Sequence, residues 1–452
     1  MDIKDLRERF EALALRRVKV GGFDVDGVLR GKYLSLDKFW SVVEDGFGFC
    51  DVIFGWDIAD LCYDNAQVTG PSTGYPDIRA KLDLNSFRVL PYEPDTGAFL
   101  LDFYGADEKP HAACPRGLLK RVVARAESQG YLPLVGAEFE FWVFRETPDS
   151  VRQKDYRQLT PLSQDMYGYS WLRTAQHKEF VRDLLDACER FAIPIEGLHT
   201  ETGPGVYEVA IKYTDALTCA DRAALFKTLA KEVAYRHGLC VTFMAKWNAS
   251  LPGSSGHLHQ SLWDSTGKKN LVADPKAEHG LSALGRSFLG GLLEGMAELT
   301  ALVAPTINSY KRYVPGVWAP MSASWGSENR TTAIRLIRGD SASSTRFEYR
   351  QTAADMNPYI AIATSLASGL YGVERKLEPL PESRGDASDN SGRMPLPTSL
   401  KAATALLKES ALARTLLGEP FVDHYVRTRE WEVRQYEKAV TDWELRRYFE
   451  SV

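Results

Sequence analysis

Apolar residues recur along this chain with two different periods, and each period predicts a different kind of element. Alternation of apolar and polar residues, typical of strands with one buried face, marks residues 135–144, 199–201, 206–208, 256–263 and 345–350. A spacing of three to four residues, typical of helices, marks residues 116–129, 178–191, 220–237, 281–303, 399–417 and 423–449. The larger part of the chain is therefore predicted to alternate strands with helices.

The first hundred residues differ in pattern from the rest. Short strands separated by turns are predicted at residues 18–31, 87–91 and 97–104. After residues 107–114 the pattern changes, and Pro115 opens a helix that Gly130 closes. Since 452 residues are too many for one ordinary core, we predict two domains, residues 1–108 and 109–452. Residues 377–397, rich in Pro, Ser, Gly and Asp, are predicted to form a surface loop.

Charged side chains occupy alternate positions on the predicted strands. Residues i and i+2 share a face of a strand, so each of these sets is expected on one face: Glu138 with Glu140; His257, His259 and Ser261; Arg346, Glu348 and Arg350. Like charges this close repel unless a cation or solvent offsets them. Any one segment could simply have a solvated face. Together they favour a Mg²⁺ or Mn²⁺ site, and the arginines beside the acids favour phosphoryl transfer.

Composition narrows the classes of function. The net charge is −5, with 44% hydrophobic and 25% charged residues, so the chain has no basic footprint for nucleic acid. No apolar run approaches the roughly 18 residues that span a membrane, and the N-terminus has no apolar signal core. The six cysteines show no CxxC pairing, which favours reduced thiols and a cytoplasmic location.

A series of motifs, in order, carries a resemblance to a known family. They are GAEFEF (136–141), HTETGPGVYE (199–208), TFMAK (242–246), GHLHQS (256–261), NSYKRYVPGVWAP (308–320), NRTTAIR (329–335) and RFEYR (346–350). Over residues 110–452 the chain resembles glutamine synthetases, and more weakly before that. The resemblance implies an α+β protein, with an N-terminal β-grasp domain and a catalytic domain that has an antiparallel sheet and flanking helices. It also implies a homo-oligomer, usually a dodecamer of two hexameric rings, with active sites between subunits.

The resemblance assigns roles residue by residue. One metal site would use Glu140, Glu201 and Glu208, and the other Glu138, His257 and Glu348, holding two or three Mg²⁺ or Mn²⁺ ions in all. ATP, the co-substrate, would contact Glu196, His259, Ser261 and Arg346, with Arg330 and Arg335 on the transferred phosphoryl group. L-Glutamate would bind Gly253, Arg312 and Arg350. ATP would convert the glutamate carboxylate to an acyl phosphate, which an amine then attacks.

The ammonium half of the expected site departs from the family. Where glutamine synthetases carry a glutamate that holds ammonium and accepts a proton, this chain has Trp318, which cannot accept a proton but can pack an apolar amine or face a cationic one. A lid or core role for Trp318 is the alternative. Val206 replaces a glutamine, and Pro252 alters the glutamate loop. The family's aspartate falls on Cys50, or on Asp51 after a one-residue shift, and Asp57 is a further candidate base.

These departures lead to three hypotheses. The first is a ligase that forms a γ-glutamylamide from L-glutamate and an organic primary amine (apolar, aromatic or polyamine), in amine catabolism or detoxification. The second is a true glutamine synthetase that uses ammonia with another base. The third is a non-catalytic structural relative, which predicts lost metal ligands. All six ligand positions hold ligand-type residues, which speaks against the third.

Overall fold

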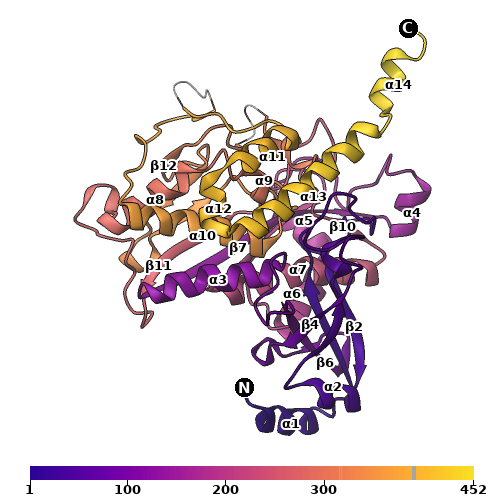
Figure 1. Ribbon diagram of the computed structural model, residues 1–452. Coiled ribbons are helices and arrows are strands. Elements are labelled where there is room, and N and C mark those ends of the chain that lie inside the picture. The colour runs from indigo at the N-terminus through magenta and orange to yellow at the C-terminus, as the bar shows by residue number, and fades with distance from the viewer. Residues whose placement is uncertain (315, 317, 389–392) are drawn as a thin grey trace.

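The computed structural model describes residues 1–314, 316, 318–388 and 393–452. Figure 1 shows a narrow, mostly β part formed by the first hundred residues, below a larger part that carries most of the helices. The α+β prediction is confirmed, since strands and helices alternate along the larger part. The predicted division at residue 108 falls in the connection between the last strand of the narrow part and the first helix of the larger one, and it stays a prediction.

The N-terminal part is built on one sheet. Among the described residues its strand order is β2-β1-β6-β4-β3, with β5 paired to β6. The elements are α1 (Ile3–Ala12), β1 (Arg17–Phe23), β2 (Leu29–Ser35), α2 (Leu36–Val42), β3 (Phe47–Cys50), β4 (Asp77–Leu82), β5 (Arg88–Leu90) and β6 (Glu93–Tyr104). The β1–β6 pair is parallel and the other pairs are antiparallel. Stacked rings of Phe10, Phe39 and Phe99 join α1 and α2 to the sheet.

The larger sheet supplies the framework of the candidate site. Its described strands run in the order β12-β13-β14-β11-β7-β9-β8, with β10 paired to β7. They are β7 (Tyr131–Phe144), β8 (Ile195–Thr200), β9 (Val206–Asp215), β10 (Cys240–Thr242), β11 (Leu258–Asp264), β12 (Trp325–Ser327), β13 (Ile334–Ile337) and β14 (Arg346–Tyr349). Neighbours are antiparallel except β12 and β13.

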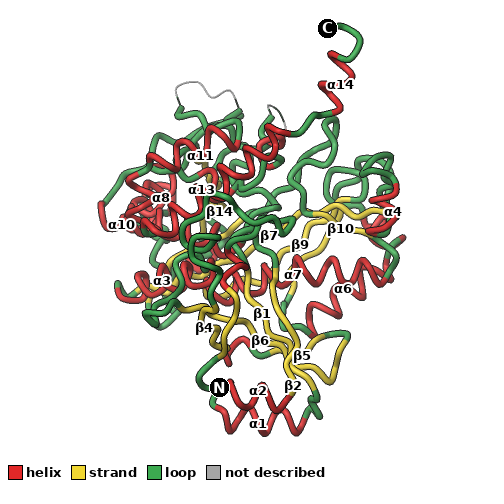
Figure 2. Tube along the Cα trace, turned by 45° about the vertical axis from the view of Figure 1, so that its right-hand side comes forward, coloured by secondary structure: helices red, strands yellow, loops and turns green. Residues whose placement is uncertain are grey.

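Helices flank this sheet, as Figure 2 shows. They are α3 (Pro115–Ser128), α4 (Pro148–Gln153), α5 (Trp171–Gln176), α6 (Lys178–Arg190), α7 (Ala216–Arg236), α8 (Ala283–Glu294), α9 (Thr300–Val303), α10 (Pro358–Arg375), α11 (Leu400–Glu409), α12 (Ala411–Leu417), α13 (Glu419–Lys438) and α14 (Asp442–Tyr448). Phe139 and Phe141 of β7 pack against Phe226 of α7. One face of β7 is therefore buried, and the alternate residues face the other way.

Three predicted helices and the predicted loop differ from the structure. Residues 281–303 form α8 and α9, because α8 ends at Gly295. Residues 399–417 divide where Ser410 caps α12, and residues 423–449 divide before Thr441, which caps α14. The loop at 377–397 is irregular where it is described, but Ala387 and Leu396 in it are buried. Its residues 389–392 lie outside the described residues.

The two parts of the chain are joined by buried charge. Arg116 of α3 donates to Asp83 and Asp102 from the N-terminal part and to Asp221 of α7. Burial opposes ionisation of Asp83, but Arg116 and Lys120 hold the pKa of its carboxyl below the usual value. A carboxylate that is paired in this way stabilises the folded state only while its partner is present.

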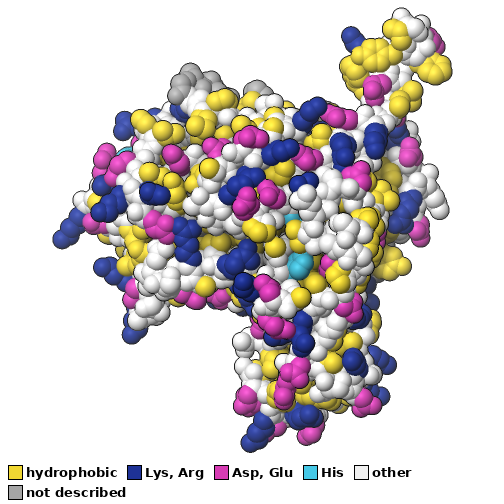
Figure 3. All heavy atoms as spheres, viewed as in Figure 1, with side chains coloured by type: hydrophobic (Ala, Val, Ile, Leu, Met, Phe, Trp, Pro, Cys, Tyr) yellow, Lys and Arg dark blue, Asp and Glu magenta, His cyan; other side chains and the backbone are white. Residues whose placement is uncertain are grey.

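The C-terminal end projects from the molecule. Figure 3 shows apolar side chains gathered on this projection, while charges of both signs are interspersed on the body below. The exposed apolar residues of the projection are Val440, Trp443, Leu445, Tyr448, Phe449 and Val452. None of the described helices is both long and apolar enough to cross a membrane.

Candidate active site

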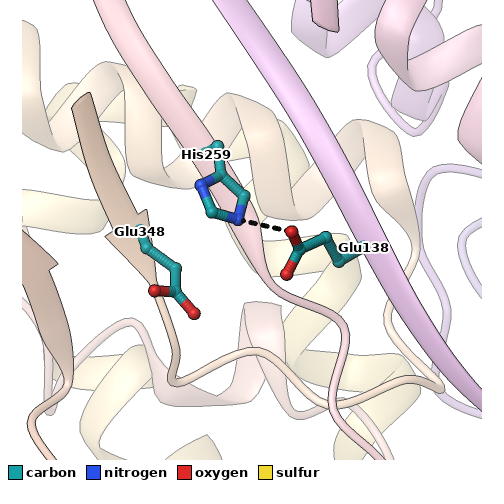
Figure 4. A group of neighbouring side chains, drawn as sticks. All are labelled: Glu138, His259 and Glu348. Atoms are coloured by element: carbon teal, nitrogen blue, oxygen red, sulfur yellow. Dashed lines mark ion pairs between the residues drawn. The ribbon is translucent and has the colours of Figure 1, made fainter. Parts of the chain in front are cut away.

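Carboxylates and imidazoles meet on the open face of the larger sheet. Glu140 of β7 lies directly opposite Glu208 of β9, and Glu138 lies two residues along the same strand. His259 Nε2 lies 3.1 Å from Glu138 Oε1, and His257 Nδ1 lies 3.4 Å from Glu348 Oε1. Figure 4 shows Glu138, His259 and Glu348 converging from three neighbouring strands. These contacts bring charged side chains of the three strands together, and their assignment as metal ligands stays a prediction.

The possible ligand groups are connected through shared residues. Among the described residues, three sets have ligand atoms within 4.8 Å of one another: Glu138, His259 and Glu348; Glu138, Glu208 and His257; His199, Glu201 and Glu208. The six residues predicted as metal ligands all lie in or beside these sets. The grouping differs from the predicted one, since His259 and His199 join the acids. Glu140 instead accepts a hydrogen bond from the Ser255 N–H at 2.6 Å.

The charges of this cluster fit a divalent cation. Burial, together with neighbouring carboxylates, raises the pKa of Glu140 to about 7 and of Glu208 to about 9. Burial also opposes ionisation of Glu138, but His259 and His257 lower its pKa. The buried Nε2 of His257 has no hydrogen-bond partner among the described residues. Crowded acids and a free imidazole nitrogen are the donor set that Mn²⁺ or Mg²⁺ would satisfy.

His199 was not predicted as a site residue. Its Nε2 lies 3.1 Å from Glu201 Oε1, and its ring stacks on Tyr169 with centroids 4.2 Å apart. The spacing of two residues between His199 and Glu201 was a signal that the sequence offered. No periodicity marks Tyr169, which comes from an irregular segment and has a positive φ of 55°.

A cavity of about 330 Å³ opens beside this cluster. Four of the six residues predicted to contact ATP line it: Glu196, His259, Ser261 and Arg346. Arg330 and Arg335, predicted to bind the transferred phosphoryl group of ATP, do not occur among the described residues of this lining. Arg346 Nε donates to His259 Nδ1 at 3.2 Å, and Trp263 Nε1 donates to Ser261 Oγ at 3.0 Å. The hydroxyls of Ser343, Ser344 and Thr345 add polar groups to the wall. Cationic and hydroxyl donors next to a metal cluster can hold the oxygens of a polyphosphate.

A second cavity, of about 260 Å³, lies on the other side of the cluster. Its lining includes the three residues predicted for glutamate and the two predicted for the amine: Gly253, Arg312, Arg350, Val206 and Trp318. A Cβ on Gly253 would lie 2.7 Å from Arg312 Cβ and 2.8 Å from the Ala245 carbonyl oxygen, so only glycine fits. Trp318 is 64% exposed, whereas Val206 is buried.

Arginines surround the cluster in different states of pairing. Arg335 donates to Glu348 at 3.1 Å and to Glu328 at 2.7 Å, and Arg350 is paired with Glu348. Arg312 is buried, yet its bonds go to Ser255 Oγ and the Gln351 carbonyl oxygen rather than to a carboxylate. Arg312 can therefore still bind an anion within the cavity.

The two predicted bases lie elsewhere. Among the described residues that line this cavity, neither Asp51 nor Asp57 occurs. Asp57 accepts from Trp431 Nε1 and from the N–H groups of Ala59 and Leu61, so both its oxygens are used. Asp51 is buried, its Oδ1 has no hydrogen-bond partner in the described chain, and burial raises its pKa. The assignment of either aspartate as base stays a prediction.

Comparison with known families now adds to this geometry. Residues 112–448 match the model of the glutamine synthetase catalytic domain. The chain belongs to the glutamine synthetase family. It is an enzyme that couples ATP to carbon–nitrogen bond formation, and its family uses ATP and divalent metal ions.

The relatives of this glutamine synthetase family member include both a glutamine synthetase and a ligase that is named for an organic amine. Type-1 glutamine synthetase 2 of Dictyostelium discoideum is 48% identical over 439 residues, which span 96% of this chain and 84% of the relative. Glutamate–isopropylamine ligase of a Pseudomonas species is 37% identical over 453 residues, spanning 100% of this chain and 98% of the relative. A solved GmaS–ADP complex superposes with a TM-score of 0.86 at 28% identity, covering 99% of this chain and 100% of that one.

Proposed function

We propose that this enzyme uses ATP to convert L-glutamate to γ-glutamyl phosphate, with release of ADP. An organic primary amine then displaces phosphate and loses a proton, which gives a γ-glutamylamide. The observation that carries the proposal is the wall of the second cavity. Trp318 and Val206 line it beside Arg312 and Arg350. By the resemblance, Trp318 stands where glutamine synthetases use a glutamate to hold ammonium, and Val206 stands where they have a glutamine. An indole and an isopropyl group favour the apolar part of an organic amine over a small hydrated cation.

The other residues support the roles assigned by the resemblance. Gly253, Arg312 and Arg350 would hold the carboxylates of glutamate, and the wall containing Glu196, His259, Ser261 and Arg346 would hold ATP. The acidic cluster would bind two or three Mg²⁺ or Mn²⁺ ions, which neutralise negative charge on phosphoryl oxygens when bound. Arg330 and Arg335 would bind the transferred phosphoryl group.

Proton removal from the attacking amine needs a base. Asp51 Oδ1 is the better candidate, because Asp57 already spends both oxygens on other donors. Asp51 would serve the cavity of a neighbouring subunit, in the shared active sites of a dodecamer. The exposed apolar residues of α14 support such assembly, since large apolar patches are usually covered by a partner.

Two relatives support an organic amine, and one supports ammonia. The Pseudomonas relative is named for isopropylamine, and the GmaS fold superposes over nearly the whole chain. The Dictyostelium relative, at higher identity, is named a glutamine synthetase, and it favours ammonia as the second candidate substrate. The unpaired cysteines support a cytoplasmic location, where thiols stay reduced.

An amine panel tests the proposal. Phosphate release by the purified enzyme with ATP, glutamate and Mg²⁺ or Mn²⁺ would be measured with ammonium, methylamine, isopropylamine, ethanolamine, benzylamine and putrescine. Reactions without glutamate are the control, and mass spectrometry identifies the amide. We expect an organic amine to give the highest kcat/KM. Turnover that is fastest with ammonium would instead establish a glutamine synthetase.

A further inference from the structure

A cavity of about 280 Å³ lies between the N-terminal sheet and α7, apart from the site described above. β1, β2, β5 and β6 form one wall, and Leu225, Thr228 and Leu229 of α7 form the other. The lining is mostly apolar. Neither the predicted metal ligands nor the residues predicted to contact ATP, glutamate or the amine occur among the described residues that line it.

One cationic side chain, Arg88, lies in the wall of this cavity without an anionic partner. Its Nη1 donates to the Ser86 carbonyl oxygen at 2.8 Å, while its buried Nε has no hydrogen-bond partner among the described residues. No carboxylate lies within 4 Å of its guanidinium in the described chain. Burial lowers the pKa of Arg88, with the charge of Asp221 acting in the opposite direction.

This state is unusual for a half-buried arginine whose Nε is removed from water. Buried arginines are nearly always paired, because losing hydration costs several kcal/mol unless an anion compensates. Arg116 and Arg429 follow the rule with aspartate partners. Arg312 does not, and it lines the cavity where a substrate carboxylate is expected. Arg88 likewise has no carboxylate partner among the described residues, and it too lies beside a cavity, of similar size.

The charges around the cavity favour an anion. Lys19 and Glu232 also line it, at exposed positions, and Lys19 Nζ lies 3.6 Å from Glu93. With Arg88 the lining carries two positive side chains and one negative. Leu90 and Phe99 contribute to the apolar remainder.

We propose that this cavity binds a small carboxylate with an apolar tail. The carboxylate would accept from the free donors of Arg88, and the tail would lie between the N-terminal sheet and α7. A charge-assisted hydrogen bond would fix the orientation, and burial of the tail would supply the rest of the affinity. This is a second site, beyond the proposed ligase reaction and independent of which amine is used.

Such a ligand would touch both parts of the molecule at once. α7 packs against β7, which carries Glu138 and Glu140. A molecule that binds only the folded arrangement raises its stability by mass action. The ligand should therefore raise the melting temperature of the intact enzyme.

Hexanoate and isovalerate are suitable probes, with hexylamine and hexanol as matched controls for charge. Binding to the full-length protein would be measured by calorimetry and by thermal shift, with and without saturating ATP and glutamate. We expect the two carboxylates to bind under both conditions and the amine and alcohol to bind far more weakly. Three results would each overturn the proposal. Hexylamine could bind as tightly as hexanoate, hexanoate could fail to bind at millimolar concentration, or hexanoate binding could be lost when glutamate is added.

Two variants locate the binding. Arg88→Met should weaken hexanoate binding by roughly ten- to a hundredfold, the loss of one charged hydrogen bond, whereas Arg79→Met, at an exposed position of the same sheet, should not. Thr228→Trp, at an exposed position on the rim, should block the cavity, with Tyr235→Trp on the same helix as control. If Arg88→Met fails to fold, Thr228→Trp decides. Unchanged affinity in Thr228→Trp would refute the site.

Discussion

Trp318 offers a quantitative test of the proposed amine site. Its side chain is 64% exposed and lines the cavity beside Arg312 and Arg350. A tryptophan can bury about 150–250 Å², so on the order of 100–150 Å² of Trp318 stays available to a substrate. An amine lying on one face would cover roughly half of that. At about 25 cal/mol per Å², this contact stabilises the transition state by about 1.5 kcal/mol, or about tenfold in kcat/KM.

The assay compares kcat/KM for ammonium and for the best organic amine. Trp318→Ala should lower kcat/KM for the organic amine by about tenfold and leave ammonium nearly unchanged. Trp318→Glu should raise the preference for ammonium, because a carboxylate attracts the cation and accepts a proton. Trp443→Ala is the matched control, since Trp443 is 62% exposed but lines neither cavity of the described active site. An equal loss with both substrates would refute the reasoning and leave Trp318 a packing residue.

Arg116→Leu should lower the free energy of unfolding by about 3–5 kcal/mol, because three aspartates lose a buried partner. Denaturant unfolding measures this loss, with Arg125→Leu as the control variant. If both variants lost the same free energy of unfolding, the prediction would be contradicted. Burial lowers the pKa of His424 to about 3, so the unfolded chain binds a proton that the folded chain does not between about pH 3 and 6.5, and stability falls as the pH drops through this window. At pH 5 this proton binding lowers the free energy of unfolding by about 2 kcal/mol. His424→Leu should remove that loss at pH 5 and change the free energy of unfolding little at pH 8. Calorimetry at both pH values measures the difference. Chelation of divalent ions should abolish turnover and lower the melting temperature. Glu208→Gln should raise the Mg²⁺ concentration that is needed to restore turnover and melting temperature. An enzyme whose turnover and melting temperature do not respond to chelation would refute metal binding by this cluster.

The strand faces of the site were predictable because they depend on local spacing. Glu138 and Glu140 share a face of β7 whatever the rest of the fold does, since side chains alternate along a strand. The ordered motifs then indicated which strands belong together. The structure brings His257, Glu348 and Glu208 to the same place through pairing of β11, β14 and β9 around β7.

Features set by tertiary contacts were not predictable in this way. Tyr169 lies on His199 only because an irregular segment returns to the end of β8. The apolar period of residues 281–303 continues past the end of α8, so periodicity alone could not locate the break at Gly295. The cavity at Arg88 depends on how α7 lies over a sheet formed by residues more than a hundred positions earlier.

The buried pairing of Arg116 has a consequence for how the gene can be shortened. A fragment that begins after residue 108 would keep Arg116 and Asp221 but lose Asp83 and Asp102. It would also remove the backbone carbonyls of Asp24 and Val25 that accept from Asn357. Leu225 and Leu229 of α7, which face the N-terminal sheet across the cavity, and the cap of α10 would then meet water. Expression of residues 109–452 alone should therefore yield aggregates, and fusions or tags belong at the ends of the full chain.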